Sequence, residues 1–159
     1  MFELEDTHRA FESAVRSWCE RELAPAVPAM ERGELLPYPL LKQFARELGI
    51  AEVLSASAER RLARLRRGAD PAPEPQPTRE GDGESSGLGG DPLLTSVLFK
   101  EICRVSPGFG MVLMATLGCG MTILARGSAD LIERYALPVL RFEKIGAWAL
   151  TEPDAGSDA

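Results

Sequence analysis

The residues best suited to chemistry lie near the end of the sequence, in the run Thr151-Glu152-Pro153-Asp154-Ala155-Gly156-Ser157-Asp158. Gly156 leaves the backbone uncovered, so a bulky anion such as a pyrophosphate can approach it, while the Ser157 hydroxyl and neighbouring N–H groups can donate to the anion. Thr151 adds a second hydroxyl, and Pro153 stiffens the turn. The pattern indicates a polar ligand held at a strand end, although a turn of this composition is by itself more often only a turn.

Three carboxylates, those of Glu152, Asp154 and Asp158, lie in the same run and would repel a bound anion. We expect them to be structural, and either to cap backbone N–H groups or to pair with cations. The apolar residues 145–150 that precede the run predict a buried strand.

Other catalytic schemes have little support. The one histidine, His8, has no serine or cysteine partner suggested by the sequence, which argues against a hydrolase triad and a histidine-based metal site. The cysteines Cys19, Cys103 and Cys119 are widely separated and odd in number, which is typical neither of a disulfide framework nor of a zinc site. We therefore predict no metal site and expect His8 at the surface.

The composition indicates one soluble domain. The 159 residues are 45% hydrophobic and 26% charged, and the length fits the roughly 100–200 residues of a domain. A net charge of −6 would repel phosphates, which argues against binding to nucleic acid. Residues 1–7 are acidic and no apolar stretch follows them, so no secretory signal is predicted, and we expect a cytoplasmic location.

Apolar stripes with helical spacing predict the elements that must position the terminal run. These predicted helices run through Phe11 to Trp18, ending near Pro25 or Pro28; from Leu40 to Leu48, closed by Gly49; from the N-cap Asp91 and Pro92 to Val105; and from Ser128 to a stop before Pro138. The chain is therefore expected to be mainly helical.

Residues 105–125 form an uncharged stretch of about the length, roughly 20 residues, that spans a membrane. Pro107, four glycines and several hydroxyl residues dilute its apolar character. We therefore favour a fully buried core helix over a transmembrane helix.

Residues 69–90 contain four prolines followed by glycines and serines, with almost no large apolar side chain. Such a segment cannot offset its ordering entropy by burial, and it is predicted to be a linker. A helical stretch just before it carries five arginines: Arg60, Arg61, Arg64, Arg66 and Arg67. Because no aromatic residue interleaves them, a solvated face, or a face paired with the acidic linker, is favoured over a nucleic-acid-binding arm.

The terminal run resembles the flavin-binding signature of the acyl-CoA dehydrogenase family, in which an apolar strand ends in Thr-Glu-Pro-x-x-Gly-Ser-Asp. The order of weaker segments is also similar, namely Gly127-Ser128, Glu133-Arg134-Tyr135, Pro138 and Glu143-Lys144-Ile145-Gly146-Ala147. The resemblance covers most of the chain and implies an all-α fold, the helical N-terminal domain of that family, with one terminal β-strand that starts a missing β-barrel domain. The expected organisation is N-terminal helices at 1–57, a basic helix and disordered linker at 58–92, core helices at 93–144 and the start of the middle domain at 145–159.

The resemblance also implies an activity: an FAD-dependent oxidoreductase of fatty acid metabolism that dehydrogenates acyl-CoA thioesters, with hydride passing to flavin N5. It implies FAD contacts by Trp148, Leu150, Thr151, Gly156 and Ser157, and a contact of Ser157 with the acyl-CoA substrate. An indole beside a strand is usually a core residue, which remains the alternative for Trp148. No catalytic residue is assigned, because the family's base is a glutamate of the C-terminal domain.

As partners, the resemblance implies electron-transfer flavoprotein or a similar acceptor, and a homo-oligomer when the protein is complete. We expect this chain alone to be inactive. The alternative is a truncated, non-catalytic helical remnant or interaction module that uses an exposed apolar face. Two departures from the family pattern stand out: residues 53–90 replace a compact loop, and Leu140-Arg141-Phe142 replaces a short turn that contains glycine.

Overall fold

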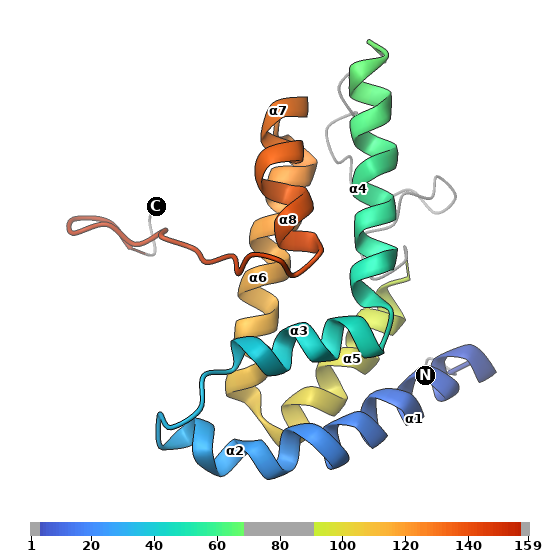
Figure 1. Cartoon of the computed structure of the whole chain (residues 1–159), viewed down its shortest axis with the longest axis vertical. Coiled ribbons are helices and arrows are strands. Elements are labelled where there is room, and N and C mark those ends of the chain that lie inside the picture. The colour runs from blue at the N-terminus through green and yellow to red at the C-terminus, as the bar shows by residue number, and fades with distance from the viewer. Residues whose placement is uncertain (1–3, 69–90, 157–159) are drawn as a thin grey trace.

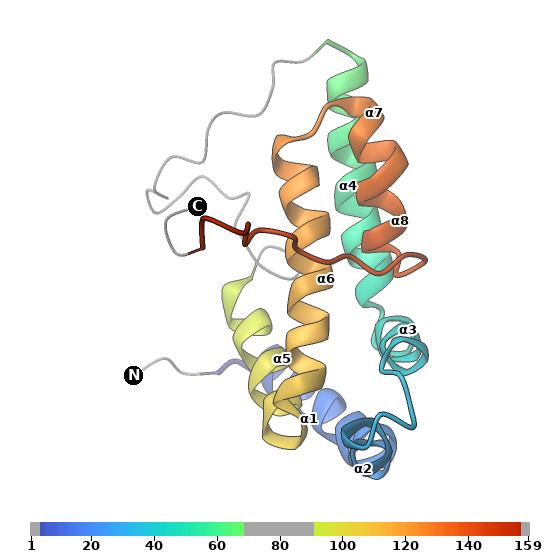
Figure 2. The same ribbon diagram turned by 90° about the vertical axis from the view of Figure 1, so that its left-hand side faces the viewer.

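A computed structural model describes residues 4–68 and 91–156, and within these ranges the secondary structure is helical and contains no strand. The elements are α1 (Asp6–Trp18), η1 (Cys19–Leu23), α2 (Ala24–Glu31), α3 (Tyr38–Glu47), α4 (Ile50–Arg66), α5 (Pro92–Val105), α6 (Pro107–Arg126), α7 (Ala129–Leu131), η2 (Ile132–Ala136) and α8 (Leu137–Leu140). α4, α6 and α8 run alongside one another, and α1 with α2 lies across one end of this layer (Figures 1 and 2). The predicted all-α fold is confirmed.

The first helical segment was predicted to end near Pro25 or Pro28. It instead runs on to Glu31. Pro25 lies in the first turn of α2, directly after the π-helical turn η1, in which the Ala24 N–H bonds to the Cys19 oxygen. The second π-helical turn, η2, likewise precedes Pro138 in the first turn of α8. A π-turn widens the helix and shifts its hydrogen-bond register, so a proline ring can follow without ending the segment.

The predicted capping residues are confirmed for three helices. Asp91 caps α5 by accepting the Leu93 N–H at 2.8 Å. Ser128 accepts the Leu131 N–H at 3.4 Å. Gly49 ends α3 with φ of +67°, the left-handed conformation that glycine adopts without steric cost.

The core centres on three aromatic rings from three helices. Trp18, Phe44 and Phe109 are at most 2% exposed, and their ring centroids lie 4.7 to 6.2 Å apart. The Trp18 indole N–H donates to Glu47 at 3.0 Å, so its one polar atom is satisfied at the edge of the core. These contacts join α1, α3 and α6.

α6 buries only one face, so the expectation of a fully buried helix is wrong for its other side. Phe109, Leu113 and Leu124 are buried, whereas Met111 and Met114 are 58% and 48% exposed. By length and composition alone, α6 would also suffice to cross a membrane, which is weak evidence because core helices pass the same test.

The basic stretch is the second half of α4, which runs without interruption across the predicted boundary between residues 57 and 58. Arg61 donates to the Ala125 carbonyl at the C-terminal end of α6, and Arg66 pairs with Glu133 of η2 at 2.6 Å. Both arginines therefore hold α4 against the helices beside it, and the first also complements the negative end of the α6 dipole. The predicted linker, residues 69–90, lies outside the described residues.

Candidate functional site

The predicted turn at the end of the chain is present. Glu152 and Ala155 exchange backbone hydrogen bonds, with N···O distances of 2.8 Å from Glu152 N and 3.3 Å from Ala155 N. Pro153 occupies the second position of this four-residue turn, where its fixed φ favours turn formation. The turn returns the backbone on itself and brings Gly156 next to Thr151, whose Cγ2 lies 3.9 Å from where a Cβ on Gly156 would be.

The candidate cofactor residues Trp148, Leu150, Thr151 and Gly156 are all exposed. Trp148 is 52% and Leu150 63% exposed, so both offer apolar surface that no described residue covers. The remaining candidate, Ser157, lies outside the described residues.

The carboxylates of the turn do not cap or pair as expected. Neither Glu152 nor Asp154 has a side-chain hydrogen bond or ion pair within the described part of the chain. They point into solvent, where ionised groups incur no desolvation cost, and an anion at the Gly156 backbone would have to lie on the side away from them. Asp158 lies beyond the described residues.

The strand predicted at residues 145–150 is not confirmed. The segment has neither helix nor strand assignment, and residues 147–150 are exposed. A strand needs a hydrogen-bonded neighbour, and the nearest element is α6, whose backbone groups already bond within the helix. The segment is instead held by small residues: Gly146 is buried against Cys119, and its carbonyl accepts from the Thr116 hydroxyl at 3.4 Å.

The turn that leads into this segment contains the only left-handed residue other than glycine among those described, Phe142, with φ of +56°. The Phe142 N–H bonds to the Val139 carbonyl, and the Glu143 N–H bonds to the Pro138 carbonyl, both at 2.9 Å. This is a Schellman motif at the end of α8 with phenylalanine where glycine is usual. The departure noted in the sequence therefore falls on a position where glycine would be unstrained.

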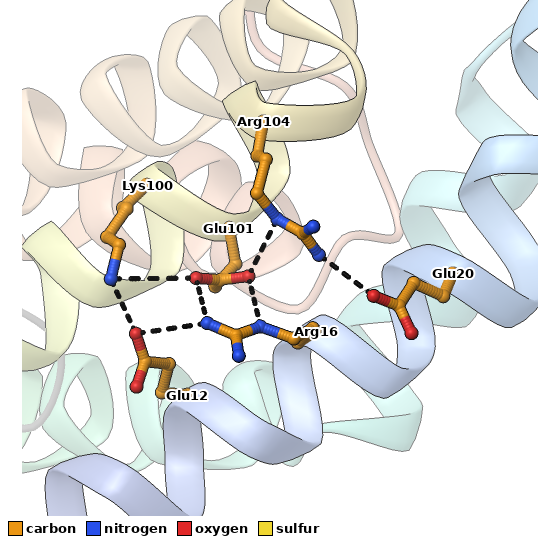
Figure 3. Close-up of polar contacts among 6 residues, drawn as sticks. All are labelled: Glu12, Arg16, Glu20, Lys100, Glu101 and Arg104. Carbon is orange, nitrogen blue, oxygen red and sulfur yellow. Dashed lines mark hydrogen bonds and ion pairs between the residues drawn. The ribbon is translucent and has the colours of Figure 1, made fainter.

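A second polar cluster lies far from the turn, between α1 and α5, and centres on the fully buried carboxylate of Glu101 (Figure 3). Arg16 binds it with two hydrogen bonds of 2.9 Å. Arg104 donates to it at 3.2 Å, and Lys100 lies 3.7 Å away.

Two further carboxylates complete this cluster. Glu12 accepts from Lys100 at 2.6 Å, and Glu20 accepts from Arg104 at 3.0 Å (Figure 3). Three acidic and three basic groups are therefore in balance. The hydrogen bonds from Arg16 hold the pKa of Glu101 below its ordinary value against the opposing effect of burial.

This cluster is suited to structure and not to proton transfer. Glu101 is held ionised and has no exposed surface, so it cannot exchange a proton with a ligand. Burial, followed by the nearby charge of Glu101, raises the pKa of the Cys19 thiol to about 11, so this thiol is not a nucleophile near neutral pH. This cluster was not predicted from the sequence, because Arg16 and Glu101 are separated by 85 residues.

His8 is buried, at 5% exposure, and the expectation of a surface histidine is wrong. Its Nδ1 accepts the Glu5 N–H at 3.1 Å, and its Nε2 lies 2.7 Å from the Asp91 carboxylate. The ring thus joins the first turn of α1 to the N-cap of α5, a contact between residues 83 apart. No group of histidines, cysteines and carboxylates in the described chain could hold a metal ion.

A surface pocket of about 280 Å³ lies between α3, the start of α4 and the turn after α8. Its charged lining is mixed, with Lys42, Arg46 and Arg141 facing Glu52 and Glu143. Arg141 is already paired with Glu59 at 2.6 Å. None of the four described candidate cofactor residues, Trp148, Leu150, Thr151 and Gly156, lines this pocket.

Comparison with known proteins identifies acyl-CoA dehydrogenases among the relatives of this chain. The mitochondrial short-chain specific acyl-CoA dehydrogenase of Mus musculus is 30% identical over 158 residues, which cover 99% of this chain and 32% of that protein. A short-chain specific acyl-CoA dehydrogenase of Clostridium acetobutylicum is 38% identical over 77 residues, 48% of this chain and 20% of that protein. A glutaryl-CoA dehydrogenase of Desulfococcus multivorans is 40% identical over 67 residues, 42% of this chain and 17% of that protein.

No family model matches the chain, and no solved structure matches it significantly. The chain spans about a third of the length of the mouse relative, and the shorter matches cover still less of theirs. The similarity nevertheless extends over nearly every residue of this chain, in agreement with the helical fold. By sequence, the chain is similar to acyl-CoA dehydrogenases over nearly its whole length.

Proposed function

We propose that this chain is the N-terminal portion of an FAD-dependent acyl-CoA dehydrogenase and supplies one side of its flavin site. The observation that carries the proposal is the match to a mitochondrial short-chain specific acyl-CoA dehydrogenase over 99% of the chain. The matched share, 32% of that relative, agrees with one domain of a larger protein.

The exposed residues fit one wall of a flavin site. Trp148 and Leu150 offer uncovered apolar surface to a planar ring. At Gly156 an added Cβ would meet nothing closer than 3.9 Å, so a diphosphate could approach this glycine from the side that a side chain would otherwise occupy. Thr151 adds an exposed hydroxyl next to this glycine. Ser157 is proposed to contact both the cofactor and the acyl-CoA.

In this proposal the chain binds and orients, and the flavin supplies the redox chemistry by accepting a hydride when bound. Trp148 and Leu150 shield one side of the ring from water, while Thr151 and the backbone near Gly156 donate hydrogen bonds. No described side chain is placed as the base that would remove a substrate proton: Glu101 is buried and paired, and the turn carboxylates are fully solvated. The chain alone is therefore proposed to be inactive.

FAD titration of the purified chain tests the flavin site directly. Trp18 is 1% and Trp148 52% exposed, so quenching by added FAD reports mainly on Trp148. We expect saturable quenching with a dissociation constant of roughly 1 mM, equivalent to about 4 kcal/mol, because only one side of the site is present. The matched control is Trp148→Leu, with free N-acetyltryptophanamide correcting for light absorbed by FAD. Linear quenching, equal in both proteins, would refute the flavin site.

A second candidate function is favoured by a specific observation, the uncharged outer face of α6. Met111, Met114 and Met121 follow one another at helical spacing there and are 58%, 48% and 36% exposed. A helical interaction module would use such a face to bind a partner. An oligomer of the purified chain in light scattering, together with an absence of FAD binding, would favour the interaction module over the flavin-binding domain.

The wider properties of the complete protein follow from the same proposal. They are an acyl-CoA substrate, a place in fatty acid metabolism, electron-transfer flavoprotein or a similar acceptor, a homo-oligomeric assembly and a cytoplasmic location.

A further inference from the structure

We propose that Gly118 of α6 is the positioning residue for Trp148, and that it sets how the indole is presented at the candidate site. The proposal rests on the proposed function for its use, because Trp148 is there a flavin contact. The contact itself is a property of this chain and can be measured without flavin.

The four glycines of α6 differ in what lies against them. A Cβ on Gly110 would lie 2.8 Å from Cys103 of α5, and one on Gly120 would lie 2.8 Å from Leu140 of α8. These two glycines let neighbouring helices approach closely, which is a common reason for glycine inside a helix. Gly118 has a different neighbour: the three atoms nearest to a Cβ placed on it all belong to the Trp148 indole.

The indole lies directly over Gly118. The Nε1, Cζ2 and Cε2 atoms of Trp148 are 3.2, 3.5 and 3.6 Å from the position that a Cβ on Gly118 would occupy. Met114 and Met121 lie four residues before and three residues after this glycine, on the same face of α6. The indole therefore lies over the glycine that separates these two methionines on the surface of α6.

The terminal segment has few other anchors near this point. It crosses α6 in an extended conformation (Figure 2), and its nearest polar tie is the 3.4 Å hydrogen bond from Thr116 to the Gly146 carbonyl. The Trp148 indole N–H has no hydrogen-bond partner within the described chain. Contact with the backbone of Gly118 thus decides where the indole rests.

Gly118→Ala tests this directly, with Gly108→Ala as the matched control. Both substitutions add one methyl to α6. At Gly118, in the helix interior, alanine also raises the helix propensity by about 1 kcal/mol, whereas Gly108 lies in the first turn, where the gain is smaller. At Gly108 the new Cβ would meet nothing closer than 3.9 Å, whereas at Gly118 it would lie 3.2 Å from the indole. Only the second substitution should displace Trp148.

The readout is acrylamide quenching and the emission of tryptophan, since Trp18 is buried from the quencher and its emission forms a background common to all variants. We expect Gly118→Ala to shift the emission to longer wavelength and to raise the quenching constant up to about twofold, because 52% exposure leaves about half of the indole covered. Gly108→Ala should leave both unchanged. Unchanged emission and quenching in Gly118→Ala would overturn the proposal.

A second variant keeps the test decisive if Gly118→Ala proves unstable. Thr116→Val removes the hydrogen bond to Gly146 without adding volume, and it should leave the quenching of Trp148 unchanged, because the contact with Gly118 positions the indole. In a Trp148→Leu background the indole is absent, so Gly118→Ala should stabilise the chain by about 1 kcal/mol through helix propensity. A rise in quenching in Thr116→Val as large as that expected for Gly118→Ala, or a loss of stability from Gly118→Ala in the Trp148→Leu background, would contradict the proposed contact. All these readings are taken without FAD, so they stand apart from the flavin titration.

Discussion

Replacing Phe142 by alanine or by glycine should reverse the usual order of stability, in which the alanine variant is the more stable of the two. Phe142 is 2% exposed, so Phe142→Ala should cost about 3–5 kcal/mol of unfolding free energy through lost burial and a cavity. Alanine at this position keeps a left-handed conformation, with φ of +56°, which costs an L-residue roughly 1–2 kcal/mol. Phe142→Gly loses the same side chain but not the strain. We therefore expect Phe142→Gly to be more stable than Phe142→Ala by about 1 kcal/mol.

The chain contains its own comparison for this position. Helices α2, α3 and α4 end with Gly33, Gly49 and Gly68 in the same left-handed conformation, with φ of 72°, 67° and 72°. α8 alone among the helices with this ending carries a larger residue there, and burial of the ring offsets its strain.

Urea unfolding of the two variants, followed by far-UV circular dichroism, gives the difference in free energy directly. The matched control is Ala63→Gly on the exposed face of α4, where glycine should cost about 1 kcal/mol relative to alanine. If Phe142→Gly were less stable than Phe142→Ala, as at an ordinary position, the inference of left-handed strain would be refuted.

Three further outcomes follow from the polar contacts. Glu101→Gln should lower the free energy of unfolding by about 3 kcal/mol, because it leaves Arg16 and Arg104 without a full partner. The control Glu31→Gln, on the exposed surface, should change it little. Equal effects of the two substitutions in urea unfolding would contradict the structural role of Glu101. Since the folded-state pKa of Glu101 is lowered, its stabilisation is present above about pH 4.3 and is lost as the pH falls through the folded pKa, so Glu101→Gln should flatten the acid side of a stability profile. Asp91→Ala should cost about 2 kcal/mol, because α5 loses its N-cap and His8 its partner, whereas Asp91→Asn keeps the cap and should cost less in thermal unfolding.

Much of the helical layout could be predicted from the sequence, because its signals act over a few residues. The N-cap at Asp91 depends on a group two positions away, and the left-handed Gly49 closes its own helix. The apolar stripe of α1 and the turn at Glu152 to Ala155 are local in the same sense. The predicted helix end at Pro25 or Pro28 was wrong, because a π-turn can accommodate a proline and has no clear signature in residue type.

The turn from Glu152 to Ala155 was predicted correctly, but the structure of the segment before it was not. The segment before it was predicted as a buried strand from its apolar residues, yet whether such residues pair into a sheet depends on a neighbouring strand, which the described chain does not contain. Burial of His8 and the pairing of Glu101 with Arg16 were also beyond sequence reasoning.

By itself, the sequence determined the resemblance to acyl-CoA dehydrogenases, the helical class and the capping residues Asp91, Ser128 and Gly49, because those signals are local or reside in a motif. The tertiary structure decided which polar groups meet across 80 residues or more, as His8 meets Asp91 and Arg16 meets Glu101. It also decided the position of Trp148, since the indole can contact a glycine of α6 only when the terminal segment crosses that helix. Contacts of this kind depend on how helices pack in space, and residue spacing along the chain does not encode that packing in a form that can be read directly.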